Sequence, residues 1–128
     1  MRRLVDSSVL IDHLRGLPRA VELLRAAAAA GDELWSVTVV RTEILAGMRP
    51  QEERATRRLF GALRWQDVTI EIADRAGALA ANYLRSHPGV DTVDYLIAAS
   101  TLFLAADLWT TNLKHFPMFP DLARPYPA

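Results

Sequence analysis

The sequence predicts an α/β fold of three layers, in which helices cover both faces of a short and mostly parallel sheet. Short apolar segments typical of strands alternate with helical segments along the chain, as in folds built on parallel strands. In addition, the segment 94–106 is apolar on every side after its opening acid, which predicts a helix buried all round. With about a dozen apolar residues it is shorter than the ~20 that span a bilayer. We therefore expect it to be the central helix of a soluble domain.

Local patterns predict the first strand and the two helices after it. Arg-Arg-Leu-Val at 2–5 ends in apolar residues and precedes Asp-Ser-Ser. This predicts a strand followed by a helix at 9–14, with Ser7 or Ser8 as its cap. The segment 18–30 begins with proline, carries apolar residues at helical spacing and stops at a glycine. It is therefore expected to form the second helix.

The middle of the chain repeats this alternation. Leu-Trp-Ser-Val at 34–37 predicts a second strand, and Thr38 is expected to cap a helix at 39–48. A charged segment at 51–63 places its apolar residues on one face, which predicts another helix. A short strand is expected at 65–68.

The last third contains two helices and the final strand. Apolar residues at helical spacing predict an amphipathic helix at 70–85, which His-Pro-Gly ends before the central helix. Leu-Trp-Thr-Thr at 108–111 predicts the last strand, and a turn is expected at 112–117. The chain shows no repeats or linkers, so we expect a single domain over 1–128.

Composition narrows the function classes. The net charge is zero and there is no cysteine, which excludes a disulfide framework and a thiolate metal site. The N-terminus lacks the apolar stretch of a secretory signal, so we expect a cytoplasmic protein without membrane contact. Fourteen of the fifteen cations are arginine. This bias is equally explained by coding composition and by phosphate binding, for which arginine is the better ligand.

Four polar residues are expected to meet at one edge of the sheet. Asp6 ends the first strand, Glu43 lies about a turn into the helix after the second strand, and Asn112 follows the last strand. Asp94 opens the helix that leads back into that strand. In open parallel sheets, ligands bind outside the carboxyl ends of the strands. The sequence therefore predicts a site formed by these four residues.

Each acid also has a structural interpretation. Asp6 alone fits a helix cap, Glu43 a solvated helix residue, and Asp94 the third residue of a capping box with Asp91 or Thr92. Taken together at one edge, however, the three carboxylates would repel by roughly 3 kcal/mol per pair at about 5 Å. Such a cluster must bind a proton or a cation. Because oxygen is the only ligand type offered, Mg²⁺ or Mn²⁺ is the expected ion.

Four motifs occur in an order that resembles a known family. They are Val-Asp-Ser-Ser-Val-Leu-Ile-Asp at 5–12, Glu-Ile-Leu-Ala-Gly at 43–47, Asp-Tyr-Leu-Ile-Ala-Ala-Ser at 94–100 and Thr-Thr-Asn-Leu-Lys-His-Phe at 110–116. Their order and spacing resemble PIN domains, and most closely the VapC toxins of bacterial toxin–antitoxin pairs. The resemblance covers nearly the whole chain and implies a PIN-like fold.

The resemblance implies a Mg²⁺-dependent endoribonuclease, with Mn²⁺ as a substitute, that cleaves RNA with metal-activated water. Its acids would be Asp6, Glu43 and Asp94. The fourth catalytic position, often aspartate in the family, is Asn112 here, which keeps an oxygen ligand but removes one charge. The residues expected to support the site are Ser8, Thr110 and Asp91. His115 is expected to have a structural or RNA-contact role.

The resemblance also implies partners. RNA would be contacted by basic residues around the acids, namely Arg41, Arg49, Arg54, Arg57, Arg58 and Lys114, and a VapB-type antitoxin would hold the protein inactive. A homodimer is usual in the family. Two other function classes stay open at this point. One is a non-catalytic PIN-like domain that binds RNA or protein, and the other is phosphoryl transfer through Asp6, for which Lys114 is the only available lysine.

Overall fold

The computed structural model describes the whole chain, residues 1–128. It contains four strands and six α-helices, and the predicted α/β class is confirmed. The elements in chain order are β1 (Arg2–Val5), α1 (Ser7–Leu14), α2 (Pro18–Ala29), β2 (Glu33–Val37), α3 (Thr38–Gly47), the 3₁₀ turn η1 (Pro50–Glu52), α4 (Glu53–Gly61), β3 (Arg64–Gln66), α5 (Ile70–Tyr83), α6 (Thr92–Phe103), β4 (Asp107–Trp109) and the 3₁₀ turn η2 (Leu113–His115).

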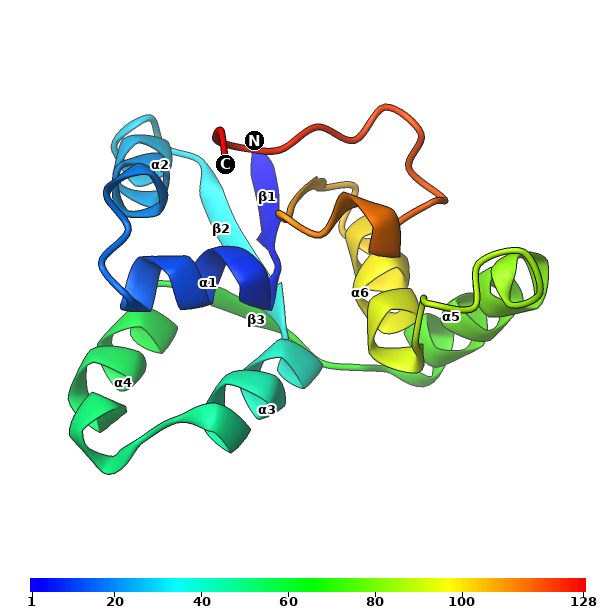
Figure 1. Ribbon diagram of the computed structural model, residues 1–128, viewed down its shortest axis with the longest axis horizontal. Helices are drawn as coiled ribbons and strands as arrows, with labels where there is room; N and C mark the ends of the chain where they lie inside the picture. The colour runs from blue at the N-terminus through cyan, green and yellow to red at the C-terminus, as the bar shows by residue number, and fades with distance from the viewer.

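The four strands form one sheet in the order β3-β2-β1-β4, and every pair is parallel. Figure 1 shows α1, α2 and α4 on one side of this sheet and α5 and α6 on the other, which gives the predicted three layers. Parallel strands need crossover connections, and here each crossover contains two helices. The carboxyl ends of β1 and β4 are neighbours, because Val5 is opposite Trp109.

The core lies between the sheet and its two helical layers. Leu4, Val5 and Val37 from the strands are completely buried, as are Val9 of α1 and Val40 of α3. Strands covered on both faces bury successive residues rather than alternate ones, which explains why the predicted strands are apolar runs. The helix α3 contacts both α1 and α6. It therefore lies beside the edge at which β1 and β4 end.

The central helix differs in two ways from the prediction. It begins at Thr92 and ends at Phe103, with Asp91 as its N-cap. Residues from Ile97 to Thr101 are buried, as expected for a helix between two layers, but Leu102 and Phe103 are 43% and 40% exposed. The prediction of burial on every side is therefore wrong for the last turn. Ala105 follows the helix with a left-handed φ of 50°.

Two predicted helix caps are wrong. The helix α1 is capped by Asp6, whose carboxyl accepts the N–H of Ser7, so neither Ser7 nor Ser8 is the cap. Thr38 is the first residue of α3 rather than its cap. The short strands β3 and β4 also begin one residue earlier than predicted and end two residues earlier. In both strands the pairing with a neighbour sets the ends, which local composition does not reveal.

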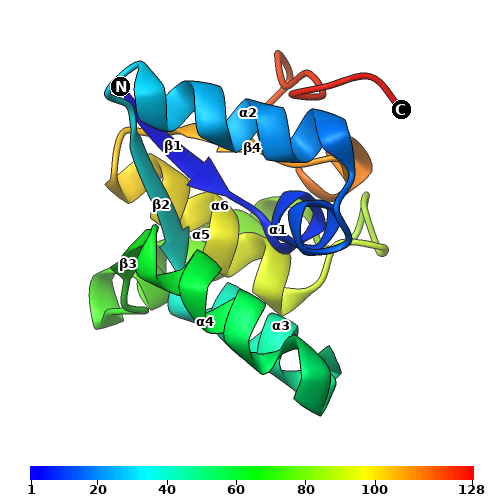
Figure 2. The same cartoon turned by 90° about the vertical axis from the view of Figure 1, so that its left-hand side faces the viewer.

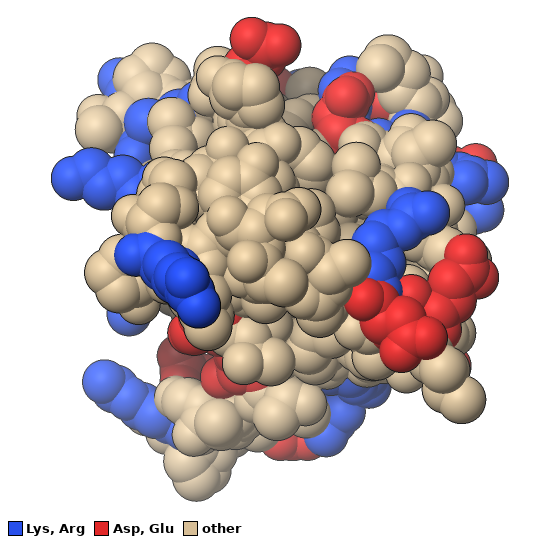
Figure 3. All heavy atoms as spheres, turned by 90° about the vertical axis from the view of Figure 1, so that its right-hand side faces the viewer, with Lys and Arg blue, Asp and Glu red and all other residues tan.

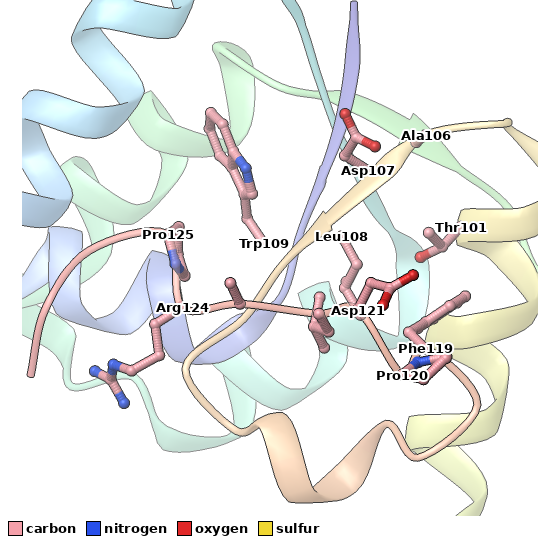
Figure 4. A pocket seen from close by; sticks show the side chains of 12 residues that line it. Thr101, Ala106, Asp107, Leu108, Trp109, Phe119, Pro120, Asp121, Arg124 and Pro125 are labelled. Atoms are coloured by element: carbon pink, nitrogen blue, oxygen red, sulfur yellow. The ribbon is translucent and has the colours of Figure 1, made fainter.

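The C-terminal segment 119–128 runs across the outside of the molecule. Figure 4 shows it passing beside β4, and a cavity of about 450 Å³ lies between the segment and the strand. Pro120 and Pro125 have no N–H to donate, so this segment does not pair as a fifth strand. It is held by side chains instead: the hydroxyl of Tyr126 donates to Asp12 across 2.6 Å, and the Arg124 guanidinium donates to the carbonyl of Thr111. None of the helices has the length and hydropathy needed to cross a membrane.

Candidate metal and RNA site

Asp6 is the most firmly held acid of the candidate site. It follows β1 directly, and only 4% of its surface is exposed. Its Oδ2 accepts the hydroxyl hydrogens of Thr110 at 2.7 Å and Ser8 at 3.1 Å, while its Oδ1 accepts the N–H of Ser7 at 2.8 Å. Each oxygen of the Asp6 carboxyl therefore has a hydrogen-bond partner, as a buried polar group requires. The helix-cap interpretation of Asp6 is confirmed, and its role in a metal site stays a prediction.

The two hydroxyls that bind Asp6 are themselves fixed by backbone N–H groups. Ser8 Oγ accepts the N–H of Thr111, and Thr110 Oγ1 accepts the N–H of Asn112, both at 3.0 Å. Thr110 has no exposed surface. The loop after β4 is therefore bound to the loop after β1 through these hydroxyls. This arrangement brings Ser8 and Thr110 to the place that the sequence predicts for supporting residues.

Asp94 lies in the first turn of α6 and is 9% exposed. It forms a capping box with Asp91, in which the N–H of each residue donates to the carboxyl of the other at 3.1 Å. The Nδ1 atom of His115 lies 3.1 Å from Oδ2 of Asp94. Burial raises the pKa of Asp94 above its ordinary value, and the charges of Asp91 and Asp6 raise it further. The hydrogen bond from the Asp91 backbone and the nearby His115 oppose this rise.

Glu43 approaches the other acids from α3, and its residue is exposed. The pKa of Glu43 is nevertheless raised, chiefly because water is excluded from its carboxyl and next because of the charge of Asp6. The charges of Asp91 and Asp94 also raise this pKa, while a hydrogen bond from the Ser7 side chain lowers it. The charges of the neighbouring acids thus act on both Glu43 and Asp94, and the joint role of Asp6, Glu43 and Asp94 as one site stays a prediction. Desolvation, rather than repulsion, is the larger cause of the shifts.

The donor set fits a hard divalent cation in its chemistry. Carboxylate, hydroxyl and amide oxygens are the ligands that Mg²⁺ and Mn²⁺ prefer, and two of the acids have raised pKa values that a cation would lower. However, no group of three or more His, Cys, Asp or Glu side chains is arranged to hold a metal ion by itself. Mg²⁺ commonly keeps several water ligands and uses only one or two carboxylates. An open acidic edge of this kind is compatible with that mode of binding.

The structure places the predicted RNA-contacting residues in different surroundings. The guanidinium carbon of Arg41 lies 4.5 Å from the ring centre of Phe60 and 5.0 Å from that of Trp65, so this side chain stacks on aromatic rings. Arg57 pairs with Glu53 at 3.2 Å on the surface of α4. Arg49, Arg54, Arg58 and Lys114 form no ion pair.

Asn112 has the fewest contacts with the other predicted site residues. It is exposed, and its side chain forms no hydrogen bond, although its backbone N–H binds Thr110. Conversely, Ser7 is a site residue that the sequence analysis treated only as a possible cap. Its N–H and its hydroxyl donate to Oδ1 of Asp6 at 2.8 Å and 3.5 Å, and its side chain lowers the pKa of Glu43. The signal that points to it is its position directly after the strand-ending acid, where a helix N-terminus directs its N–H groups outward.

The fold and this acidic edge define a PIN domain. A family model described as "PIN domain" matches residues 3–117. The relative "Ribonuclease VapC19" of Mycobacterium tuberculosis is 48% identical over 124 residues, which cover 97% of this chain and 99% of the relative. "Ribonuclease VapC10" of the same organism is 44% identical, with 96% and 92% covered. The chain belongs to the VapC family of PIN-domain proteins, as the sequence motifs predict.

Solved structures agree with this assignment at the level of fold. A toxin–antitoxin complex from Klebsiella pneumoniae contains a chain with a TM-score of 0.80 and 24% identity, and the match covers 98% of this chain and 99% of that one. VapBC2 from Rickettsia felis, bound to a DNA fragment from its promoter, gives a TM-score of 0.78 with 20% identity and covers 97% of both chains. The predicted PIN-like architecture is therefore confirmed.

Proposed function

We propose that this protein is a divalent-metal-dependent endoribonuclease and the toxin of a VapBC-type pair acting in the cytoplasm. The observation that carries the proposal is the meeting of Asp6, Glu43 and Asp94 at one sheet edge in a chain that is 48% identical to a VapC ribonuclease. These acids, with the Asn112 side chain, would hold Mg²⁺ or Mn²⁺. The bound ion would supply a water of lowered pKa and stabilise charge on a phosphodiester.

The residues of the chain have distinct tasks in this proposal. Asp6 is oriented by Ser7, Ser8 and Thr110, so it provides a fixed oxygen at the floor of the site. Glu43 and Asp94 have raised pKa values. They therefore bind a cation more strongly as pH rises and protons leave. Asp91 orients Asp94 through the capping box.

The direct test is incubation of single-stranded RNA with the protein and Mn²⁺, followed by mapping of new 5′ ends. We expect cleavage that EDTA abolishes and that Asp6→Asn reduces by at least a hundredfold. The matched control is Asp74→Asn, which removes an exposed carboxylate on α5 and should cleave like the parent. Binding of RNA without any cleavage by the parent would instead identify the non-catalytic PIN-like domain as the function.

An apolar groove supports an antitoxin as the partner. Residues of α1, α2, β2 and α4 line a cavity of about 510 Å³, and its apolar walls include Val21, Leu24, Leu34, Leu59 and Leu63. The similar structures include VapBC complexes. We assign this groove to the apolar segment of a VapB-type antitoxin. Leu59 and Leu63 are part of the core, so the test is Val21→Glu at its partly exposed rim, which should weaken the complex.

The homodimer is supported by exposed apolar residues on the side formed by α5 and α6. Figure 3 shows that this side is largely uncharged at its centre, with Lys and Arg side chains mainly toward the rim. The exposed large apolar residues there are Ile70, Leu84, Leu102 and Phe103. We assign this surface to a second copy of the chain. Light scattering of the parent and of Leu102→Glu should give the masses of a dimer and a monomer, respectively.

A further inference from the structure

A small cavity adjoins the acidic edge between α1, α3 and the turn that leads into α4. Its volume is about 170 Å³, and Glu43 forms part of its wall. Pockets for drug-sized ligands are larger, about 300–1,000 Å³, so this cavity suits a smaller group. Figures 1 and 2 show α3 and α4 below α1. We call this cavity the Glu52 pocket.

The walls of the Glu52 pocket combine apolar surfaces with charged side chains of both signs. Ile11, Ile44 and Met48 contribute the apolar part. Arg15, at the end of α1, forms no ion pair or side-chain hydrogen bond and is exposed. Glu52, the last residue of η1, also belongs to the wall. An occupant with apolar faces and a polar edge would satisfy both parts of such a pocket.

Glu52 is held in place while keeping acceptor capacity. Its Oε1 accepts the backbone N–H of Arg49 at 2.7 Å. A carboxylate has about four acceptor sites, so both oxygens remain able to accept further hydrogen bonds. The wall also contains Thr56, which is 1% exposed and whose hydroxyl has no hydrogen-bond partner. Buried hydroxyls normally have a partner, so this part of the pocket wall has unused hydrogen-bonding capacity.

A nucleobase is the occupant that these features favour. Single-stranded RNA is recognised largely through splayed-out bases, which stack on aromatic side chains or arginine and are read by hydrogen bonds at their edges. A free phosphate is disfavoured because Glu43 and Glu52 are both acidic. Glu43 belongs both to the pocket wall and to the proposed cleavage site, so the pocket adjoins that site.

We propose that the Glu52 pocket seats one unpaired base of the RNA substrate and that Glu52 and Arg15 make guanine the preferred base. This inference rests on the proposed ribonuclease function. Guanine is the one base that presents two donors, N1–H and the N2 amino group, side by side to a carboxylate. Its O6 and N7 atoms accept from an arginine, which is the commonest specific contact to guanine. Glu52 would read the donor edge and Arg15 the acceptor edge.

Cleavage of a randomised single-stranded RNA pool tests the proposal. The parent should cut with guanine enriched at one position beside the cut, by about tenfold, the scale of one good bidentate contact. Glu52→Gln keeps an acceptor for the Arg49 N–H but replaces the second carboxylate oxygen with a donor. Both Glu52→Gln and Arg15→Met should lose the guanine enrichment beside the cut, and both should still cleave the RNA pool. The matched controls are Glu71→Gln and Arg75→Met, which make the same charge changes on the exposed face of α5 and should keep it.

A binding measurement separates this inference from the ribonuclease proposal. In EDTA, the inactive Asp6→Asn variant should bind a short oligoadenylate containing a single guanine several times more tightly than oligoadenylate alone, and Glu52→Gln should remove the difference. Cleavage without base preference, or with a preference that both variants retain, overturns the pocket proposal alone. Selective binding without cleavage by the parent overturns the ribonuclease proposal alone. A pocket that takes up an antitoxin side chain instead would show no guanine selectivity in either measurement.

Discussion

Thr110 donates its hydroxyl hydrogen to Oδ2 of Asp6 across 2.7 Å, and both residues are almost completely buried. The two are 104 positions apart and are brought together because β1 and β4 are parallel neighbours. The bond connects the two strand ends that form the floor of the acidic site. The same Thr110 hydroxyl oxygen accepts the backbone N–H of Asn112. This bond fixes the loop that carries Asn112, the fourth predicted site residue.

Replacing Thr110 by valine should therefore affect both stability and activity. Thr110→Val keeps the shape of the side chain but leaves Asp6 with one donor fewer and the Asn112 N–H without its acceptor. We expect the free energy of unfolding to fall by about 1–3 kcal/mol and RNA cleavage to fall by at least tenfold. Urea unfolding and the cleavage assay measure the two effects. Thr111→Val is the control, because Thr111 contributes only backbone groups to this network.

The raised pKa values of Glu43 and Asp94 predict a pH dependence of stability in the absence of metal. Their ordinary values are 4.5 and 3.8, and both are higher in the folded protein. Between each ordinary value and the raised one, the folded state binds more protons than the unfolded state. The contribution of these groups to stability is therefore full below the ordinary values and is lost as pH rises through the raised ones.

Asp94→Asn isolates this contribution. In EDTA, the variant should be more stable than the parent at neutral pH, and the advantage should shrink as pH falls toward 4. Urea unfolding at several pH values gives the difference, in which the ion pairs of Asp32 and Glu33 cancel because both proteins have them. Asp74→Asn should show no such trend. An advantage that is independent of pH would mean that the Asp94 carboxyl is not destabilised by its charge.

Arg41 is expected to stabilise the fold rather than to bind RNA. Its guanidinium stacks on Phe60 and Trp65, and such contacts contribute about 0.5–2 kcal/mol. Arg41→Gln should therefore lower the free energy of unfolding by that amount and leave RNA affinity near that of the parent. Arg54→Gln is the variant for comparison, because the Arg54 side chain is exposed and forms no ion pair. A loss of RNA affinity in Arg41→Gln without loss of stability would restore the sequence-based assignment of this residue.

Ala105 offers a stabilising substitution. Its φ of 50° lies in the left-handed region, which costs a residue with a Cβ roughly 1–2 kcal/mol. Glycine adopts it freely but loses more chain entropy on folding, by about 0.5–1 kcal/mol. Ala105→Gly should therefore raise the free energy of unfolding by up to about 1 kcal/mol. Ala106→Gly, at the next position without a positive φ, should lower it in the same urea experiment.

The strands and helices that the sequence predicts well are those set by local patterns. The strand at Arg2–Val5 is confirmed at both ends, and α5 begins at Ile70 as predicted, because its apolar periodicity and the cap at Thr69 are local features. The ends of β3 and β4 are less predictable. Each has three residues, and pairing with one neighbour decides where it starts.

The sequence predicts which acids lie near the site, but it does not predict the side-chain contacts around them. Asp6 is placed by the rule that strand ends meet at one edge, and Asp94 is placed by its position at the start of the helix that leads back into β4. The contact of His115 with Asp94 depends instead on the path of the chain between α6 and η2. The stacking of Arg41 similarly depends on how α4 and β3 pack against α3. Neither contact has a periodic signal in the sequence, because each joins elements whose relative placement only the tertiary fold fixes.

The pairing of β1 with β4 has a consequence for synthesis of the protein on the ribosome. The sheet contains no hairpin. Its first strand, β1, can pair with β4 only after Asp107–Trp109 has been synthesised. Contacts of such long sequence separation form late in folding. The carboxylate of Asp6 emerges early, but Asp94 and Thr110 emerge only when most of the chain has been made. A partly synthesised chain that has not reached β4 therefore lacks the acidic site.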